Sequence, residues 1–265
     1  MHDLVHDLAT LIGAKFYFRT EKFGKETKID NKTRHLSFNN ISDPMTDNFE
    51  IFDRAKHLRT FLTFNFTPFH NEMAACIILL NLKCLRVLSF QKFRDLNALP
   101  DSIGELIHLS YLDLSSTTIK TLPESLCNLH NLQTLKLYHC YQLIKLPNGM
   151  QKLVNLRYLD IRKTRKLEDM PREMSKLNNL QYLSCFVVGK HKEKGIKELR
   201  TLTNLHGSLS ISKLENVSNN IEASQAKIME SDILGLNPFS NTKIFLVFNI
   251  LQLTTTLLGE LHQPL

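Results

Sequence analysis

The chain has 265 residues, of which 43% are hydrophobic and 22% are charged, and its formal net charge at pH 7 is +7. These proportions are ordinary for a soluble globular protein, and the length allows one or two domains with a large core. Lysine and arginine are scattered rather than gathered in one stripe, so the charge predicts no nucleic-acid partner. The five cysteines show no CxxC spacing. They argue against a disulfide framework or a structural zinc site and favour reduced thiols in a cytosolic or nuclear protein.

The first twelve residues, MHDLVHDLATLI, predict a short amphipathic helix. Positions four residues apart share a helix face, so His2 lies above His6 and Asp3 above Asp7. These pairs could form a metal clamp, or they could be the polar side of a helix whose other side is apolar. A zinc protease motif needs Glu at its second position and a third ligand. Asp3 stands at that position and no pattern supplies the third ligand, so we predict no metal site.

Two Gly-Lys pairs, in FGKET at 23–27 and VVGKHKEKG at 187–195, raise the question of a phosphate-binding loop. Neither has the preceding glycine at the required distance, and neither opens a helix after a buried strand. The chain also lacks a Gly-x-Ser-x-Gly elbow and any Ser or Cys beside a predictable His base. No catalytic residue and no enzymatic activity are therefore predicted.

The central feature is an internal repeat. Leucines that open an LxxLxL pattern stand at Leu85, Leu109, Leu132, Leu156 and Leu180, in steps of 24, 23, 24 and 24 residues. The prolines of LP or MP pairs repeat at Pro100, Pro123, Pro147 and Pro171, in steps of 23, 24 and 24. This spacing is typical of a leucine-rich repeat, in which a short strand is followed by a variable return segment.

The repeat predicts which side chains form the core. Its fourth and sixth positions point inward from the strand, and in three successive repeats they are Leu112, Leu114, Leu135, Leu137, Leu159 and Ile161. The ninth position holds Thr117, Cys140 and Thr164, which are small enough to bond turn backbone or fill the space between coils. The LP pair begins the convex side, where proline suits irregular backbone. No single repeat buries its own apolar face, so the repeats must stack.

Weaker repeats flank this centre. LRTFLTF from Leu58 precedes Leu85 by 27 residues, and RHLSF from Arg34 is predicted as the first strand. After Leu180 the phase slips, and GSLSIS from Gly207 predicts another strand with Leu209 and Ile211 inward. About eight strands result, which exceeds the roughly three repeats that a solenoid needs. The fold class is thus α/β, a solenoid with parallel strands on its concave face and an irregular or helical convex side.

The apolar stretch IFLVFNILQLTTTLL at 244–258 is shorter than the roughly 20 residues that span a membrane. Polar residues also interrupt it. We therefore expect a buried strand or an irregular tail rather than a membrane span.

Strand residues at positions two, three and five face the concave side. Position three stacks three tyrosines in one column, and Tyr and Arg are enriched at the energetic centres of protein interfaces. The column is thus predicted to bind a protein, the alternative being an ordinary solvated strand face. The residues predicted to contact the partner are Arg86, Tyr111, Asp113, Lys136, Arg157, Tyr158, Asp160 and Tyr182.

Three ordered stretches resemble a known family. They are MHDLVHDLA followed by KFYFRTE, RHLSF followed by LRTFL, and LSCFVVGKHKEKGIKELRTLTNLHGSLSISKLENV at 183–217. Together they are similar to the C-terminal part of plant intracellular immune receptors, the disease resistance proteins of the coiled-coil, nucleotide-binding, leucine-rich-repeat family. The resemblance implies three parts. Residues 1–33 would be a remnant of the end of the nucleotide-binding (winged-helix) module, 34–217 the solenoid, and 218–265 a divergent tail.

The resemblance also implies roles. His2 would read the phosphate end of ADP and Asp3 would support its orientation, but only within a full nucleotide-binding module. We expect no cofactor in this chain, and ADP or ATP in a full-length receptor. The implied partners are a pathogen effector, a guarded host protein or the receptor's own nucleotide-binding module, with no nucleic acid and no membrane span. The implied location is the cytoplasm.

Two features depart from the family pattern. The phosphate-binding loop and the coiled coil that would precede Met1 are missing, and after AKIMES the expected further leucine-rich strand is replaced by an unrelated tail. The first hypothesis remains the recognition and autoregulatory region of a plant disease resistance protein. One alternative is a stand-alone leucine-rich-repeat scaffold that binds another protein. The other is a metal-dependent hydrolase that uses His2 and His6.

Overall fold

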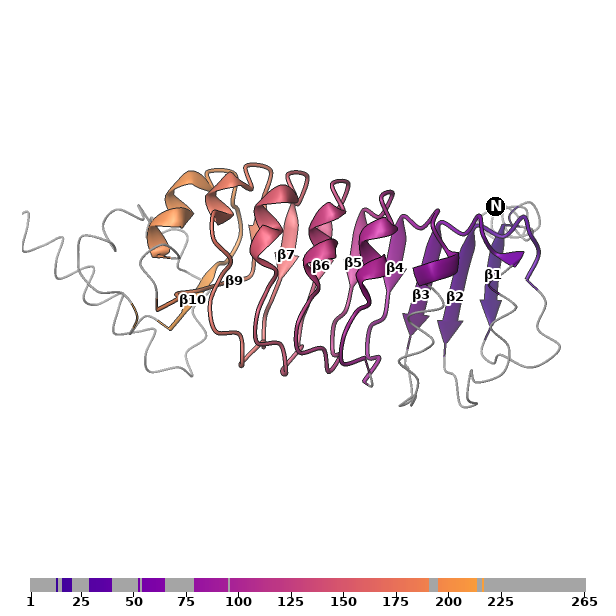
Figure 1. Ribbon diagram of the computed structural model, residues 1–265, viewed down its shortest axis with the longest axis horizontal. Coiled ribbons are helices and arrows are strands. Elements are labelled where there is room, and N and C mark those ends of the chain that lie inside the picture. The colour runs from indigo at the N-terminus through magenta and orange to yellow at the C-terminus, as the bar shows by residue number, and fades with distance from the viewer. Residues whose placement is uncertain are drawn as a thin grey trace, which may run out of the picture.

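The computed structural model is an elongated solenoid in which each strand lies beside the next along the long axis (Figure 1). It describes residues 13, 16–20, 29–39, 52, 54–64, 79–94, 96–190, 195–213 and 216. Eight strands form one parallel sheet in sequence order: β1 (Tyr17–Thr20), β2 (His35–Asn39), β3 (Thr60–Phe64), β4 (Val87–Ser89), β5 (Tyr111–Asp113), β6 (Thr134–Lys136), β7 (Tyr158–Asp160) and β8 (Tyr182–Leu183). The stacked parallel strands confirm the predicted repeat architecture.

The strand register follows the leucine period. Tyr111 pairs with Val87 and Thr134, and Tyr158 pairs with Thr134 and Tyr182. Equivalent repeat positions therefore form straight rows across the sheet. Successive side chains of a strand point to opposite faces of the sheet. The row formed by the next residue of each strand therefore points into the core.

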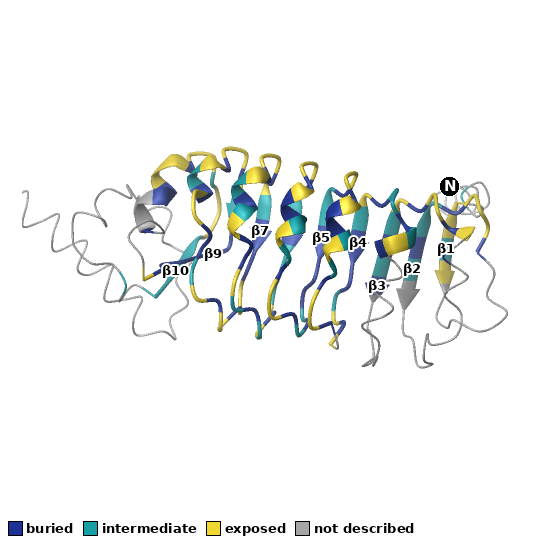
Figure 2. Cartoon of the chain, viewed as in Figure 1, coloured by how far each residue is buried: buried dark blue, intermediate teal, exposed yellow. Residues whose placement is uncertain are grey.

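The core contains the side chains that the repeat predicted. Leu112, Leu114, Leu135, Leu137 and Leu159 are 0% exposed, and Ile161 is 1% exposed. Figure 2 shows the same pattern, with buried residues running along the inside of the coils and exposed residues on the outer turns. Each coil buries its leucines against its two neighbours, which is why the repeats are stable only as a stack.

Phenylalanines replace leucines toward the N-terminal end of the core. The rings of Phe52, Phe61, Phe90 and Phe93 follow one another, with centroids 6.1, 6.1 and 5.6 Å apart. Their tilted and edge-to-face geometry is the arrangement that aromatic pairs prefer.

The convex side carries single turns of 3-10 helix: η2 (Asp101–Glu105), η3 (Glu124–Asn128), η4 (Asn148–Lys152), η5 (Met174–Lys176) and η7 (Ile196–Thr201). Pro100, Pro123 and Pro147 directly precede the first three. Proline fixes φ near −65° and removes an N–H that the first turn leaves unbonded. The LP pair therefore begins the convex side, as predicted.

Polar side chains tie neighbouring coils together. At the ninth repeat position the Cys140 thiol donates to the Leu114 carbonyl of the preceding coil at 3.0 Å, whereas the Thr164 hydroxyl bonds within its own coil, to the Ile161 carbonyl at 2.7 Å. A second row comes from asparagines that precede the opening leucines. Their amides donate across to the preceding coil at 2.8, 2.8, 2.8 and 2.7 Å, from Asn131, Asn155, Asn179 and Asn204. The leucine period did not predict this second row.

Two expectations about the ends of the sheet are wrong. RHLSF is not the first strand, because β1 pairs in parallel with β2 and so extends the sheet into the segment 1–33. After β8 a separate two-stranded sheet forms from β9 (Cys185–Val187) and β10 (Ser210–Ser212), and β10 confirms the strand predicted in GSLSIS. The described chain thus has ten strands rather than about eight. Leu209 and Ile211, predicted inward, are half-buried and pack against the core.

Several predictions fall on residues that the structure does not describe. These include the helix of 1–12, with His2, Asp3 and His6, and the apolar stretch at 244–258. In the part of the chain that is described, no helix is long and apolar enough to cross a membrane.

Replacing Leu135 by Ala tests the register of the core. Leu135 is fully buried, so Leu135→Ala should lower the free energy of unfolding by about 2–5 kcal/mol. Denaturant unfolding followed by circular dichroism measures it. Val154→Ala removes an apolar side chain that is 50% exposed and should change stability far less. Equal losses in the two variants would contradict the assigned register.

Candidate functional site

The face of the sheet opposite the core, here called the open face, presents the tyrosine column predicted on the concave side. Tyr111, Tyr158 and Tyr182 are all half-buried on β5, β7 and β8. The rings of Tyr158 and Tyr182 stack, with centroids 4.3 Å apart and planes 8° from parallel. Each ring therefore limits the rotamers of the other, and a partner would meet an already ordered aromatic surface.

Lys136 of β6 lies over the ring of Tyr111. Its ammonium lies 5.4 Å from the centre of the Tyr111 ring, a cation–π distance. The neighbouring Tyr111 hydroxyl raises the pKa of Lys136, and the nearby Asp113 raises it further. Burial raises the pKa of Tyr111. At neutral pH this part of the open face therefore carries a protonated lysine beside a neutral phenol.

Asp160 and Arg162 form a two-pronged ion pair at the end of β7. Arg162 Nη2 lies 2.6 Å from Asp160 Oδ2, and Arg162 Nε donates to Oδ1 at 2.9 Å. The carboxylate side chain is 3% exposed, whereas the arginine side chain is 52% exposed. Burial opposes ionisation of Asp160, but the hydrogen bonds from Arg162 outweigh it and hold the carboxyl pKa below its usual value. The exposed charge at this point is thus the guanidinium.

Two cations lie over the ring of Tyr138, which follows β6 by two residues. The Arg162 guanidinium lies 5.4 Å and the Lys163 ammonium 5.1 Å from the centre of its ring. Contact with the ring holds both long side chains close to the surface, where a guanidinium remains available to a carboxylate. We define the tyrosine–cation surface as Tyr111, Lys136, Tyr158 and Tyr182 of the open face, together with Tyr138, Arg162 and Lys163.

The structure brings most of the predicted contact residues together. Tyr111, Lys136, Tyr158 and Tyr182 share the tyrosine–cation surface, while the exposed Arg86 and Arg157 directly precede β4 and β7. Asp113 and Asp160 lie on the same face but are only 6% and 2% exposed. Asp113 accepts hydrogen bonds from the Ser115 amide at 2.9 Å and the Tyr111 hydroxyl at 3.2 Å. The two carboxylates therefore support their neighbours and do not present a free negative charge.

Sequence reasoning missed Tyr138, Arg162 and Lys163 as surface residues. They follow the strands, where the chain turns, and equivalent positions differ from repeat to repeat. The turns after the strands share one conformational feature. The residue at the eighth repeat position has a left-handed φ, at Lys92, Ser116, His139 and Lys163. A turn of fixed shape after every strand directs its side chains to the same edge of the sheet. The composition of those turns could have indicated the cations.

Two of the four described thiols are buried, and the described residues form no metal cluster. Burial raises the pKa of the Cys127 thiol to about 11 and also raises that of Cys140. Both thiols are therefore protonated at neutral pH and act as small core side chains. Among the described residues no three His, Cys, Asp or Glu side chains gather as metal ligands. His2 and His6 lie outside these residues, so their proposed metal role stays untested.

Repeats of 23 or 24 residues, each with a short parallel strand, a buried leucine set and a 3-10 return turn, define a leucine-rich-repeat protein. The family model described as "Leucine-rich repeat region" matches residues 57–236, and the chain belongs to that family. Solved structures share the fold. A leucine-rich-repeat protein of Leptospira interrogans has a TM-score of 0.51 and 23% identity, over 70% of this chain and 50% of that one.

A further solved relative in fold is the leucine-rich-repeat ectodomain of the receptor kinase GASSHO1/SCHENGEN3 of Arabidopsis thaliana, in complex with Casparian strip integrity factor 2. Its TM-score is 0.53 at 17% identity, and the match covers 76% of this chain and 28% of that one. At such identity the likeness establishes the fold alone.

Curated relatives point to plant disease resistance proteins. A protein of Arabidopsis thaliana named as a disease resistance protein is 44% identical over 239 residues, which is 88% of this chain and 17% of the relative. RPP13-like protein 1 of the same plant is 37% identical over 51% of this chain and 13% of its own length. RGA1 of Solanum bulbocastanum is 37% identical over 86% of this chain and 20% of its own length. The chain thus corresponds to the leucine-rich-repeat region of such proteins and spans 13 to 20% of their length.

The Asp160–Arg162 pair predicts a dependence of stability on pH. The carboxyl pKa lies below its unfolded value of 3.8, so the carboxylate contributes stability above pH 3.8 that is lost as the pH falls through the folded pKa. Asp160→Asn should lower the free energy of unfolding at pH 7 by about 1–3 kcal/mol. The difference from the parent should shrink in acid.

Denaturant unfolding at a series of pH values checks this prediction. Asp113→Asn is the matched control, because Asp113 occupies the same repeat position and its carboxylate accepts from an amide and a hydroxyl rather than from a guanidinium. It should cost less at pH 7. A loss for Asp160→Asn that stays constant from pH 7 into acid would contradict the ion-pair account.

Proposed function

We propose that the tyrosine–cation surface is the protein-recognition surface of a plant disease resistance receptor. The observation that carries the proposal is the ordered set of aromatic rings and cations on one face of the sheet, with Tyr158 stacked on Tyr182 and Lys136 over Tyr111. Tyrosine and arginine are enriched among the few residues that contribute most of the binding energy in protein interfaces. Because these side chains are held in place before binding, less conformational entropy is lost on association.

The proposed partners are a pathogen effector, a guarded host protein, or the receptor's own nucleotide-binding module. The names of the curated relatives support a role in defence, and their greater length leaves room for further modules. The similarly folded receptor kinase ectodomain holds a protein ligand, which supports a binding role for the architecture. In this proposal the region acts by contact and carries out no reaction of its own.

The proposed location is the cytoplasm. The described cysteines Cys84, Cys127, Cys140 and Cys185 are all free thiols, which suits a reducing compartment. In a full-length receptor we also propose that His2 and Asp3 belong to an ADP or ATP site of the nucleotide-binding module. That part of the proposal rests on the resemblance of MHDLVHDLA to the family's motif.

The surface can be tested with a combined Tyr111→Ala, Tyr158→Ala and Tyr182→Ala variant. A partner is recovered from plant extract with the parent chain, identified by mass spectrometry, purified and titrated against both proteins. Loss of three ordered rings should weaken its Kd at least about tenfold, which corresponds to about 1.4 kcal/mol.

The matched control is a combined Ile107→Ala and Val154→Ala variant, because these apolar side chains are 56% and 50% exposed and lie outside the tyrosine–cation surface. It should bind as the parent does. Unfolding curves establish that both variants are folded. Unchanged binding by a folded tyrosine variant would show that recognition uses another surface.

A further inference from the structure

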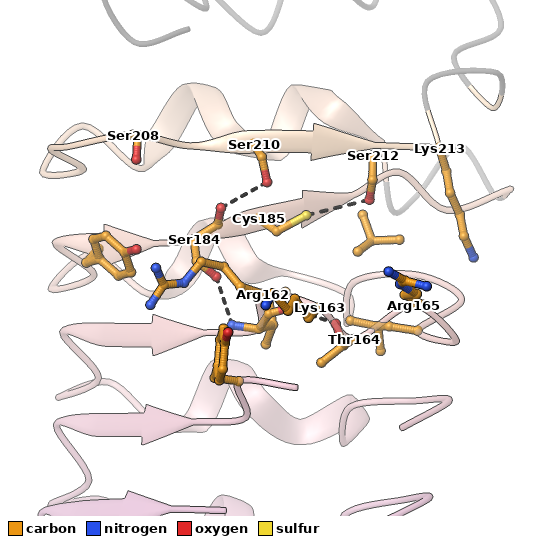
Figure 3. A pocket seen from close by; sticks show the side chains of 15 residues that line it. Arg162, Lys163, Thr164, Arg165, Ser184, Cys185, Ser208, Ser210, Ser212 and Lys213 are labelled. Atoms are coloured by element: carbon orange, nitrogen blue, oxygen red, sulfur yellow. Dashed lines mark hydrogen bonds between the residues drawn. The ribbon is translucent and has the colours of Figure 1, made fainter. Parts of the chain in front are cut away.

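A cavity of about 640 Å³ lies where the turn after β7 faces the small sheet of β9 and β10. Arg162, Lys163 and Arg165 line it from the turn, and Lys213 lines it from the end of β10. Figure 3 shows Arg165 and Lys213 toward one end of the cavity and Arg162 toward the other, with the serines of β10 along one wall. This cavity is here called the basic pocket.

The described lining contains these four cations and no carboxylate. Among the described residues, the only carboxylate bound to one of them is Asp160, which is buried beneath Arg162 and compensates that charge alone. Lys213 Nζ donates to the neutral Glu168 carbonyl at 2.9 Å, and Lys163 lies over the Tyr138 ring. The other three charges therefore add to a positive potential inside a concave site, where fields are stronger than on a flat surface.

The repeat architecture does not require cations at this place. The turn positions filled by Arg162, Lys163 and Arg165 hold Ser115, Ser116 and Thr118 in the repeat from Leu109, and Tyr138, His139 and Tyr141 in the repeat from Leu132. Those coils stack equally well without a basic triplet. The fourth cation joins them because the chain slips in register after β8, so that β10 pairs with β9 and ends beside this turn.

We propose that the basic pocket binds the carboxylate side chains of an acidic, extended segment in the partner protein. Arginine presents a planar fork of donors that matches a carboxylate, and the lysines add point charges around it. Tyr138 and Tyr182 line the same cavity, so the pocket is continuous with the tyrosine–cation surface. This inference rests on the proposed function and adds the chemistry of the ligand to it.

The test uses the full chain and a fluorescein-labelled peptide of alternating Glu and Gly, with a Gln–Gly peptide of the same length as the uncharged probe. Binding is measured by fluorescence anisotropy at low and at physiological ionic strength, because screening weakens contacts between charges. The pocket variant combines Lys163→Asn, Arg165→Gln and Lys213→Asn. Asparagine tolerates the left-handed φ of 61° and 59° at the two lysines, and Arg162 is kept because it holds Asp160.

The control variant removes three cations elsewhere, through Lys56→Gln, Lys120→Gln and Lys152→Gln, all at exposed positions outside the pocket. We expect the glutamate peptide to bind the parent and the control alike, and to bind the pocket variant at least about tenfold more weakly. The glutamine peptide should bind none of them. Equal weakening of peptide binding in the two variants would show a diffuse charge effect and would overturn the proposed binding site. Absence of glutamate-peptide binding to the parent at low ionic strength would overturn it as well.

Inorganic phosphate gives a second readout. If phosphate at low concentration displaces the glutamate peptide, the pocket is a phosphate site and the acidic-segment proposal fails. The two proposals also fail separately. A partner that loses affinity for the tyrosine variant but not for the pocket variant would overturn only the pocket, whereas the reverse pattern would overturn the tyrosine–cation surface and leave the pocket standing.

Discussion

The structure depends on one constraint: a single coil of 23 or 24 residues cannot bury its own leucines. Each coil exposes an apolar face that only a neighbouring coil can cover, so the strands are forced into parallel register, one repeat apart. The same constraint leaves the opposite face of the sheet free of any packing role. Rows of equivalent residues therefore lie in straight columns on that face, and their chemistry can vary while the core stays fixed.

The tyrosine–cation surface follows from that freedom. Register places Tyr158 directly beside Tyr182, and Arg162 and Lys163 of the following turn lie over the Tyr138 ring. The buried carboxylate of Asp160 holds the Arg162 guanidinium in position from below. The surface thus combines apolar area, positive charge and restricted side-chain motion, which together favour binding to another protein over any reaction chemistry. The slip in register after β8 places the basic pocket at the edge of the tyrosine–cation surface.

The features that could be predicted from the sequence are those that recur with the leucine repeat. The core leucines, the tyrosine column and the prolines that begin the convex side all repeat with the coil, and all were found at the predicted places. The strands β1 and β9 were missed because YFRT and CFV lack the LxxLxL pattern. The burial of Asp113 and Asp160 was missed because it depends on hydrogen bonds from a tyrosine hydroxyl, a turn amide and a turn guanidinium, which the leucine period does not specify. Arg162 and Lys163 were overlooked for the same reason.

Hydrogen–deuterium exchange on this chain, alone and saturated with its identified partner, tests the central claim most directly. The account predicts that the partner slows exchange in 134–139, 158–164 and 182–187, where the tyrosine–cation surface and the basic pocket lie. Exchange in η2 and η3 on the convex side should be unchanged. Protection confined to those 3-10 turns, with the strands unaffected, would contradict recognition through the open face.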